Sequence, residues 1–312
     1  MDKNTYRVLS PEVNWFNFTS NFAGNIFGAQ TIYLLLRNKF EILPLTCSLK
    51  ILEQGETIRV DGLNFRGTDL DTFRLNQAEH SLTDGIHAPL TTSGARGIFL
   101  QSGAGIWFTP TISNTDSSNE AIEEGLDFWF LVNSTGHHQL GVSFDKGKPT
   151  QISWVRQNNS QNTAIVEIGA LTQKKLSLPD QIMGGIFEGT LLVVDAKLAI
   201  TFEPFQFNPN LNFDQSDSSR SAYNFLGSTF VITPNSLRSD AALVVESAVI
   251  ESPLSIYYSR ARYNKAGRFL DFSHGILRRK AEAKTLFHIA DTALPQRTRT
   301  LELVAYQRNL YK

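Results

Sequence analysis

The chain has 312 residues, of which 41% are hydrophobic, and its 29 Lys and Arg nearly balance its 30 Asp and Glu. A formal net charge of −1 excludes the broad positive field that recruits nucleic acid or an anionic membrane surface. The chain has 22 Phe and 8 Tyr but only 2 Met, an excess of rings that is typical of β proteins, because flat side chains pack well on a pleated surface. The only cysteine, Cys47, cannot form an intramolecular disulfide, and no metal-ligand spacing is found along the chain.

The chain begins Met1-Asp2-Lys3-Asn4, which lacks the basic start and the apolar run of a signal peptide. No apolar stretch reaches the ~20 residues that a helix needs to cross a bilayer. We therefore expect a cytoplasmic protein with no membrane span, and we expect neither nucleic acid nor a lipid bilayer as its partner.

Period-two alternation of apolar and polar residues recurs along the chain, whereas helical periodicity is nearly absent, so we predict strands. The alternating segments include residues 138–144, 151–156, 190–201, 228–233 and 241–250. Asp61-Gly62 and residues 145–149 and 264–267 have the composition of hairpin turns. Short connections of this kind make neighbouring strands antiparallel, and the expected fold class is all-β.

Alternation also predicts which side chains share one face of a strand, because successive side chains point to opposite sides. His138 shares its face with Leu140, Val142 and Phe144, while small or polar residues fill the other face. We expect the face of His138 to turn into the interior of a barrel.

Two polar segments, residues 113–125 and 208–222, interrupt the strands and are expected to be loops at the open end of a barrel. Between them, two lysines and a proline break the alternation over residues 172–181. We place a domain boundary there and predict two units, residues 1–175 and 176–312.

The two halves begin and end with similar segments. An Ile-Phe pair flanked by glycines leads into a strand at Phe27 in the first half and at Phe187 in the second. Each half also closes with a hairpin whose second strand carries an arginine, Arg156 or Arg278. The same order at both ends indicates an internal repeat.

The repeat has the physical character of a calycin barrel. Glycines let the first strand bend where the barrel floor closes, and an aromatic ring plugs that floor. An arginine on the last strand covers the ring with cation–π attraction, so Arg156 would cover Phe27 and Arg278 would cover Phe187. We therefore predict two tandem calycin (lipocalin-like) antiparallel β-barrels packed together.

Several segments resemble the cyanobacterial DUF3598 family in their order and character. They lie at residues 81–85, 97–100, 103–108, 137–145, 230–234, 259–264 and 275–279. The resemblance implies two lipocalin-like barrels that are related to the single-barrel lyases that attach bilins to phycobiliproteins. The closing strands depart from the family, because Gln157 and Arg279 stand where it commonly has glutamate, and this departure weighs against bilin transfer.

Three residues are candidates for catalysis: His138, Arg260 and Arg262. In a barrel interior His138 is either an acid or base of the pocket or an ordinary core histidine. Arg260 and Arg262 share one face with Tyr258, and if that face is interior they can bind a carboxylate, phosphate or carbonyl group of a ligand. If the face points outward, they are solvated surface residues.

Aromatic side chains are the candidates for ligand binding, because they stack against conjugated molecules as well as filling a core. Alternation places Phe128 and Phe130 on one face of their strand and Trp129 on the other. The full set of candidates is Trp107, Phe128, Trp129, Phe130, Trp154 and Tyr258.

The function predicted from the sequence is the binding of a hydrophobic small molecule, of a polyene or pigment-like kind, in a barrel pocket and without a cofactor. One alternative is a cofactor-independent cyclase or isomerase of a natural-product pathway, which needs mainly shape and a few polar groups and so leaves little motif in a sequence. Another alternative is a bilin lyase-like chromophore chaperone. The residues alone leave open whether the protein is an enzyme or a carrier.

Overall fold

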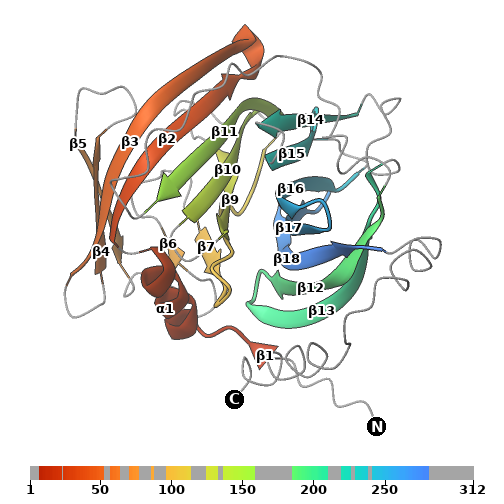
Figure 1. The fold of residues 1–312 in the computed structure, drawn as a ribbon, viewed down its shortest axis with the longest axis horizontal. Coiled ribbons are helices and arrows are strands. Elements are labelled where there is room, and N and C mark those ends of the chain that lie inside the picture. Colours follow the sequence, from red (N-terminus) through yellow and green to blue (C-terminus); the bar gives the residue numbers. More distant parts are fainter. Residues whose placement is uncertain are drawn as a thin grey trace, which may run out of the picture. The chain divides into compact units, whose positions relative to one another are not determined.

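The computed structural model describes residues 7–22, 24–52, 57–63, 70–76, 86–87, 96–113, 124–132, 136–158, 185–209, 219–225, 229–237 and 241–280. The chain divides into two compact units, Met1–Arg279 and Lys280–Lys312. The described part of the first unit consists mainly of two antiparallel sheets (Figure 1). The expected all-β class is therefore confirmed.

The first sheet has ten described strands, all of them from the first half of the chain. They are β2 (Gly24–Leu34), β3 (Lys39–Leu52), β4 (Thr57–Leu63), β5 (Leu70–Asn76), β6 (Ile86–His87), β7 (Arg96–Phe99), β8 (Gly105–Phe108), β9 (Glu124–Leu131), β10 (Gly136–Asp145) and β11 (Lys148–Asn158). Their order in space is β5-β4-β3-β2-β11-β10-β9-β8-β7-β6. The pairing of β2 with β11 brings the two ends of this half together, and a short 3-10 helix, η1 (Leu35–Arg37), joins β2 to β3.

The second sheet has eight described strands, in the order β1-β13-β12-β18-β17-β16-β15-β14. They are β1 (Arg7–Val8), β12 (Phe187–Asp195), β13 (Ala199–Phe207), β14 (Arg220–Phe225), β15 (Thr229–Pro234), β16 (Leu243–Ser252), β17 (Ser255–Tyr263) and β18 (Phe269–Arg279). Here β12 pairs with β18, just as β2 pairs with β11, so the strands that carry the sequence repeat occupy matching positions in the two sheets. Neither sheet closes into a barrel within the described ranges. The expected boundary at residues 172–181 lies outside these ranges, and the division into residues 1–175 and 176–312 stays a prediction.

The expected turns have different outcomes. Lys146 and Gly147, with φ of 50° and 69°, join β10 to β11, and this pair of positive φ values is what a tight hairpin requires. Gly267, with φ of 73°, lies in the turn between β17 and β18. The prediction of a turn at Asp61-Gly62 is wrong, because both residues lie inside β4 and pair with β3.

The segment at residues 190–201, which alternation predicts to be one strand, is a hairpin. Strand β12 ends at Asp195, whose Oδ1 accepts hydrogen bonds from the backbone N–H groups of Lys197 (2.8 Å) and Ala199 (2.9 Å). Leu198 has a φ of 64°. This local hydrogen bonding by an aspartate reverses the chain where the apolar pattern alone predicts that the strand continues.

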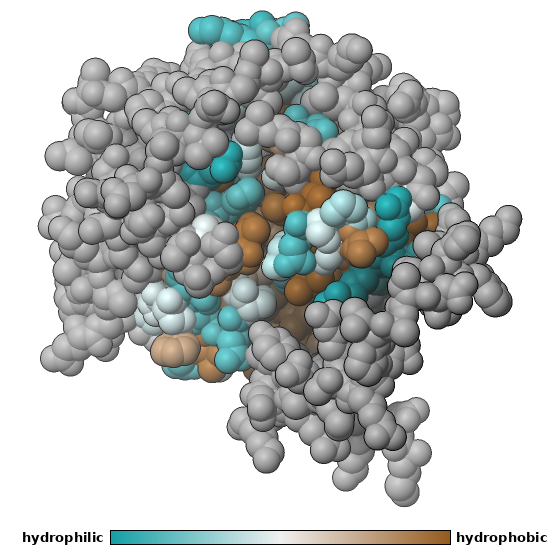
Figure 2. All heavy atoms as spheres, in the orientation of Figure 1, coloured by the Kyte–Doolittle hydropathy of each residue, from teal (hydrophilic) through white to brown (hydrophobic). Residues whose placement is uncertain are grey.

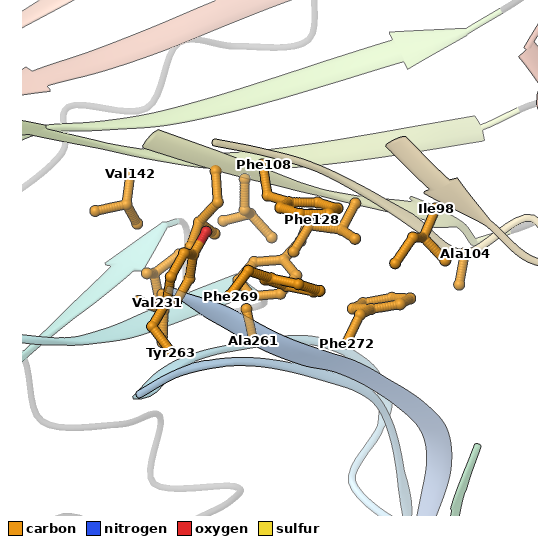
Figure 3. Close-up of a cluster of buried hydrophobic side chains, with 14 of the residues drawn as sticks. Ile98, Ala104, Phe108, Phe128, Val142, Val231, Ala261, Tyr263, Phe269 and Phe272 are labelled. Atoms are coloured by element: carbon orange, nitrogen blue, oxygen red, sulfur yellow. The ribbon is translucent and has the colours of Figure 1, made fainter. Parts of the chain in front are cut away.

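The two sheets pack face to face through a large hydrophobic core. Phe108 of the first sheet stacks on Phe269 of the second, with ring centroids 3.8 Å apart, and Phe128 approaches Phe272 at 6.4 Å. Figure 3 shows these rings among aliphatic side chains that come from both sheets. We call the side of the first sheet that enters this core its contact face.

The contact face contains the strand pattern identified from the sequence. Leu140, Val142 and Phe144 are at most 3% exposed and belong to this core, so their shared face is confirmed. The prediction that this face lines the interior of a barrel is wrong, because the face packs against the second sheet. Alternation reveals which residues share a face, but it carries no information about what covers that face.

A helix, α1 (Pro11–Phe22), covers the opposite side of the first sheet, and the sequence pattern did not predict it. The signals for its start were present: the backbone N–H of Val13 donates to Ser10 Oγ (3.2 Å), with Pro11 at the first position and Glu12 in the first turn. Trp15, Phe18 and Phe22 are buried at helical spacing, but the exposed Val13 and Phe16 interrupt this apolar stripe in the sequence, so a search for periodicity missed it.

Two asparagines of α1 attach the helix to β7. Asn14 Nδ2 donates to the Gly97 carbonyl (2.9 Å), while Asn14 Oδ1 accepts from the Phe99 N–H (2.6 Å). Asn17 Nδ2 donates to the Phe99 carbonyl (3.0 Å). We call the side of the first sheet beneath α1 the helix face. No helix in the described part of the chain is long and apolar enough to span a membrane.

The second sheet has a smaller core on the side that faces away from the first sheet. The fully buried ring of Phe187 lies there, with the Arg279 guanidinium 5.8 Å from its centroid. An arginine therefore covers the Phe187 ring, but the residue is Arg279, so the prediction of Arg278 as the cover is wrong by one residue. Gly185 makes room for the Arg279 guanidinium, because a side chain at this position would collide with it.

Hydrophobic and hydrophilic described residues lie side by side near the centre of the view in Figure 2.

Candidate ligand-binding site

The candidate residues from the sequence do not converge on one site. Trp107 and Trp129 lie on the helix face, in contact with α1. Phe128, Phe130, His138 and Trp154 lie on the contact face of the same sheet, and Tyr258, Arg260 and Arg262 lie on the side of the second sheet that carries the smaller core. We call this last side the arginine face.

The register of the first sheet aligns two rows of residues across the helix face, because directly paired residues in antiparallel strands point to the same side. The first row is Phe99, Gly105, Trp129, Gln139, Val155 and Gln30. The second row is Gly97, Trp107, Asp127, Gly141, Ser153 and Ile32. The aromatic residues of both rows lie at β7–β9, whereas β10, β11 and β2 contribute small, polar and aliphatic residues.

The aromatic end of the helix face is a wall of rings under α1. Phe18 lies 4.5 Å from Phe99 and, edge-on, 5.7 Å from Trp107. Phe22 lies 4.7 Å from Trp129, also edge-on. Edge-to-face contacts of this kind fix ring orientation, so the wall is a closely packed cluster of buried rings.

The other end of the helix face is polar and sterically small. A side chain at Gly141 would collide with Asp127 Oδ1 and Ser153 Oγ, so both oxygen atoms lie over this glycine. Ser153 and Gln30 are only 7% and 8% exposed. Polar groups are therefore buried beside the aromatic wall, on the same side of the sheet.

Three buried polar atoms of the helix face have no hydrogen-bond partner: Trp129 Nε1, His137 Nδ1 and Gln30 Oε1. His137 lies on this face next to Gln139 along β10, and its ring is 5.0 Å from that of Phe22. The three side chains are at most 8% exposed. Each buried atom without a partner costs roughly 1–3 kcal/mol, and native proteins pair the great majority of such groups. Ordered water or a bound molecule can supply the missing partners.

His137 is neutral in this environment. Burial lowers its pKa from the ordinary 6.5 to about 4. At neutral pH the ring therefore has one N–H donor and one acceptor nitrogen and carries no charge. Such a group suits the recognition of a neutral polar atom on a ligand.

On the contact face, His138 is half-buried, at the margin of the core between the two sheets. Its ring is 5.9 Å from Trp154, which in turn lies 5.6 Å from Phe225 of the second sheet. The Arg156 guanidinium is 5.5 Å from the Trp154 ring centroid. Arg156 thus covers Trp154, and the side chain of Phe27, its expected partner, is outside those that the structure describes.

The arginine face carries ion pairs that belong to the protein itself. Arg262 donates two hydrogen bonds to the Asp271 carboxylate, from Nε to Oδ1 (2.9 Å) and from Nη2 to Oδ2 (2.8 Å). These contacts raise the pKa of Arg262. Arg260 Nη2 donates to Glu203 Oε2 (2.9 Å) and its guanidinium lies 5.1 Å from the Phe205 ring. The two arginines proposed from the sequence as ligand clamps therefore already bind carboxylates.

A third pair lies deeper on the same face. Glu246, with a side chain 4% exposed, accepts hydrogen bonds from both Arg220 Nη2 and the Tyr258 hydroxyl. Burial and the neighbouring Glu246 raise the pKa of Tyr258 well above its usual value, so the hydroxyl stays protonated. Tyr258 also stacks on Phe205, with centroids 4.9 Å apart. The network satisfies its own charges, as a buried network of this kind must.

No three His, Cys, Asp or Glu side chains in the described ranges lie close enough together to hold a metal ion. The roles of the nine residues named from the sequence stay predictions. Sequence reasoning did not single out Gln30, Phe18 and Phe22, and it used His137 only as the neighbour of His138. The alternation in β10 contained a signal for this site, because it put small and polar residues opposite the large apolar ones.

Comparisons with known proteins give a likeness in structure but not in sequence. No family model matches the chain, and no curated protein matches it. A protein of unknown function from the DUF3598 family of Nostoc punctiforme PCC 73102 matches 86% of this chain and 99% of its own, at a TM-score of 0.61 and 12% identity. The S-type phycobiliprotein lyase CPES from Guillardia theta matches 49% of this chain and 98% of its own, at a TM-score of 0.35 and 6% identity. The resemblance seen in the sequence is thus confirmed in the fold: the chain folds as this DUF3598 protein does.

Proposed function

We propose that the protein binds a hydrophobic, conjugated small molecule on the helix face of the first sheet. The observation that carries this proposal is the set of three buried polar atoms without partners, Trp129 Nε1, His137 Nδ1 and Gln30 Oε1, beside an aromatic wall. Rings give a conjugated ligand a flat surface on which to stack, and a few polar groups fix its orientation.

The unpartnered atoms also define the polar groups of the ligand. Trp129 Nε1 is a donor, so it requires an acceptor such as a carbonyl oxygen, whereas Gln30 Oε1 requires an N–H or O–H group. His137 Nδ1 is a donor in one neutral tautomer of the ring and an acceptor in the other, so it can pair with either kind of ligand group. A polyene or pigment-like molecule that carries both a carbonyl and an N–H or O–H group meets all of these requirements.

Native mass spectrometry of the freshly expressed full chain, followed by extraction, tests the proposal directly. We expect a bound mass with visible or near-ultraviolet absorption. If the expression host lacks the ligand, retinoic acid and biliverdin serve as polyene and pigment probes, with tryptophan fluorescence as the signal. The absence of a bound mass, together with the absence of saturable quenching by both probes, would contradict the proposal. Chemical conversion of a bound polyene without added cofactor would instead indicate a cyclase or isomerase.

Matched variants place the binding on the helix face. The double variant Trp129→Phe with Gln30→Leu removes two unpartnered polar atoms and keeps apolar bulk, so we expect ligand occupancy to fall at least about tenfold. The control is Asn224→Leu, which also removes an unpartnered amide oxygen but lies on the second sheet. Equal loss in the control and in the double variant would move the site away from the helix face.

A further inference from the structure

A second group of unpartnered nitrogen atoms lies on the contact face, on the opposite side of the first sheet. Phe130, His138 and Arg156 are directly paired across β9, β10 and β11, and Trp154 lies in the adjacent row. Trp154 Nε1 and His138 Nδ1 are both buried and have no hydrogen-bond partner. Trp154 is only 4% exposed, so water does not readily compensate its N–H.

Arg156 adds an unpaired positive charge to this group. No carboxylate in the described part of the chain pairs with it, and its guanidinium lies beside the Trp154 ring, 5.5 Å from the centroid. Arg156 and His138 are half-buried, whereas Trp154 and Phe225 are buried behind them. The charged end of the group therefore reaches solvent, and its aromatic end belongs to the core.

The arginine face holds two arginines beside aromatic rings, Arg260 and Arg279. Arg279 lies 5.8 Å from the Phe187 centroid with no carboxylate partner in the described part of the chain, whereas Arg260 has one. Arg260 lies beside the ring of Phe205, 5.1 Å from its centroid, and forms an ion pair with Glu203, whose Oε2 is 2.9 Å from Arg260 Nη2. Arg220 and Arg262 have carboxylate partners as well. Arg156, like Arg279, lies beside a ring without a carboxylate partner. What distinguishes Arg156 is the pair of unpartnered nitrogen atoms next to it, Trp154 Nε1 and His138 Nδ1.

We propose that Arg156, Trp154 and His138 bind the carboxylate group of a small organic acid at the edge of the contact between the two sheets. Arg156 supplies charge-assisted hydrogen bonds and Trp154 Nε1 supplies a third donor. The apolar part of the acid lies against the rings of His138 and Trp154. This site is separate from the helix face, because residues 138, 154 and 156 point to the side of the sheet opposite to Trp129 and Gln30.

The indole N–H signals of the ¹⁵N-labelled full chain test this proposal, because the four tryptophans give separate resonances. Trp154→Phe assigns the signal of Trp154. Titration with benzoate should shift that signal saturably, while the neutral isostere benzamide should not shift it. Arg156→Gln should weaken benzoate binding about ten- to a hundredfold, the usual range for a charge-assisted contact.

Arg278→Gln is the matched control, because it removes the same charge from an exposed position of the second sheet and should leave benzoate binding unchanged. An unshifted Trp129 signal shows that Arg156→Gln keeps the fold of the first sheet. The absence of a saturable shift, an equal shift by benzamide, or unchanged affinity in Arg156→Gln would each overturn the proposal and leave water as the partner of these nitrogens. The proposed function would be unaffected, since the Trp129 signal and not the Trp154 signal reports on the helix face.

Discussion

The helix face of the first sheet and the arginine face of the second both bury polar groups among aromatic rings, but they satisfy them differently. On the arginine face, Arg220, Arg260 and Arg262 each find a carboxylate of the protein. On the helix face, Trp129 Nε1 and Gln30 Oε1 are buried and have no hydrogen-bond partner. The arginine face also has two buried atoms without partners, Arg260 Nε and Asn224 Oδ1. The two faces therefore differ in their charges: the arginine face pairs its buried charges within the protein, whereas the unpartnered atoms of the helix face belong to uncharged groups. Arginines looked like the better ligand residues in the sequence, yet the structure favours the uncharged groups.

The largest effect should come from breaking the paired network. Glu246→Leu leaves the Arg220 guanidinium and the Tyr258 hydroxyl without their shared acceptor, so we expect the free energy of unfolding to fall by about 3 to 5 kcal/mol. Urea unfolding followed by fluorescence measures the change. Glu203→Leu is the control, since its side chain is 41% exposed and should cost under about 1 kcal/mol. Similar losses in both variants would show that the depth of the network does not matter.

Acid should weaken both sheets, because each contains a buried histidine that is neutral in the folded state, His137 in the first and His274 in the second. Burial lowers the pKa values of His137 and His274 from 6.5 to about 4. The unfolded chain therefore binds more protons below pH 6.5, so the contribution is complete above that pH and is lost as the pH falls toward 4. At pH 5 the loss should be about 2 kcal/mol for each histidine relative to pH 7.

The pH dependence of the urea midpoint checks this expectation. His274 lies in the core, where it contacts Ser259 and Phe272, and His274→Phe should flatten the curve between pH 7 and 5. A variant whose midpoint falls as steeply as that of the parent chain would show that His274 is already charged in the folded state.

Two buried amides give the sharpest test of paired against unpaired groups. Asn14 makes hydrogen bonds through both its Nδ2 and its Oδ1, so Asn14→Leu should destabilise the protein by about 2 kcal/mol. Gln30 Oε1 makes none, so Gln30→Leu should stabilise the ligand-free protein by about 1 kcal/mol. Thermal unfolding of the ligand-free protein compares the two. A clear loss of stability in Gln30→Leu would mean that Gln30 has a structural role and would weaken the proposed site.

The smallest expected effect concerns the cover of the plug in the second sheet. Arg279→Met removes the cation beside Phe187 and should cost about 0.5 to 1 kcal/mol. Arg278→Met, one residue earlier and exposed, should change stability by less than about 0.5 kcal/mol. The opposite order in urea unfolding would restore the assignment made from the sequence.

Local patterns predicted much of the strand structure and part of the site. Alternation correctly placed Phe128 and Phe130 opposite Trp129, because the two-residue period of a strand is a local property. It failed where a side chain bonds to its own backbone, as Asp195 does in the hairpin inside residues 190–201. It also missed α1, whose start depends on Ser10 and Pro11 and not on an apolar stripe.

The sequence by itself determined the all-β class, the doubled arrangement of strands and the sets of side chains that share a face, because backbone geometry and nearest neighbours decide these features. Only the tertiary structure decided what each face meets. His138 lies on the contact face, toward the second sheet, and His137 beneath α1, although the two are adjacent in sequence. Whether a buried polar atom has a partner depends on residues far apart along the chain. That long-range pairing gives the arginine face its ion pairs and leaves three uncharged groups of the helix face with unpartnered atoms.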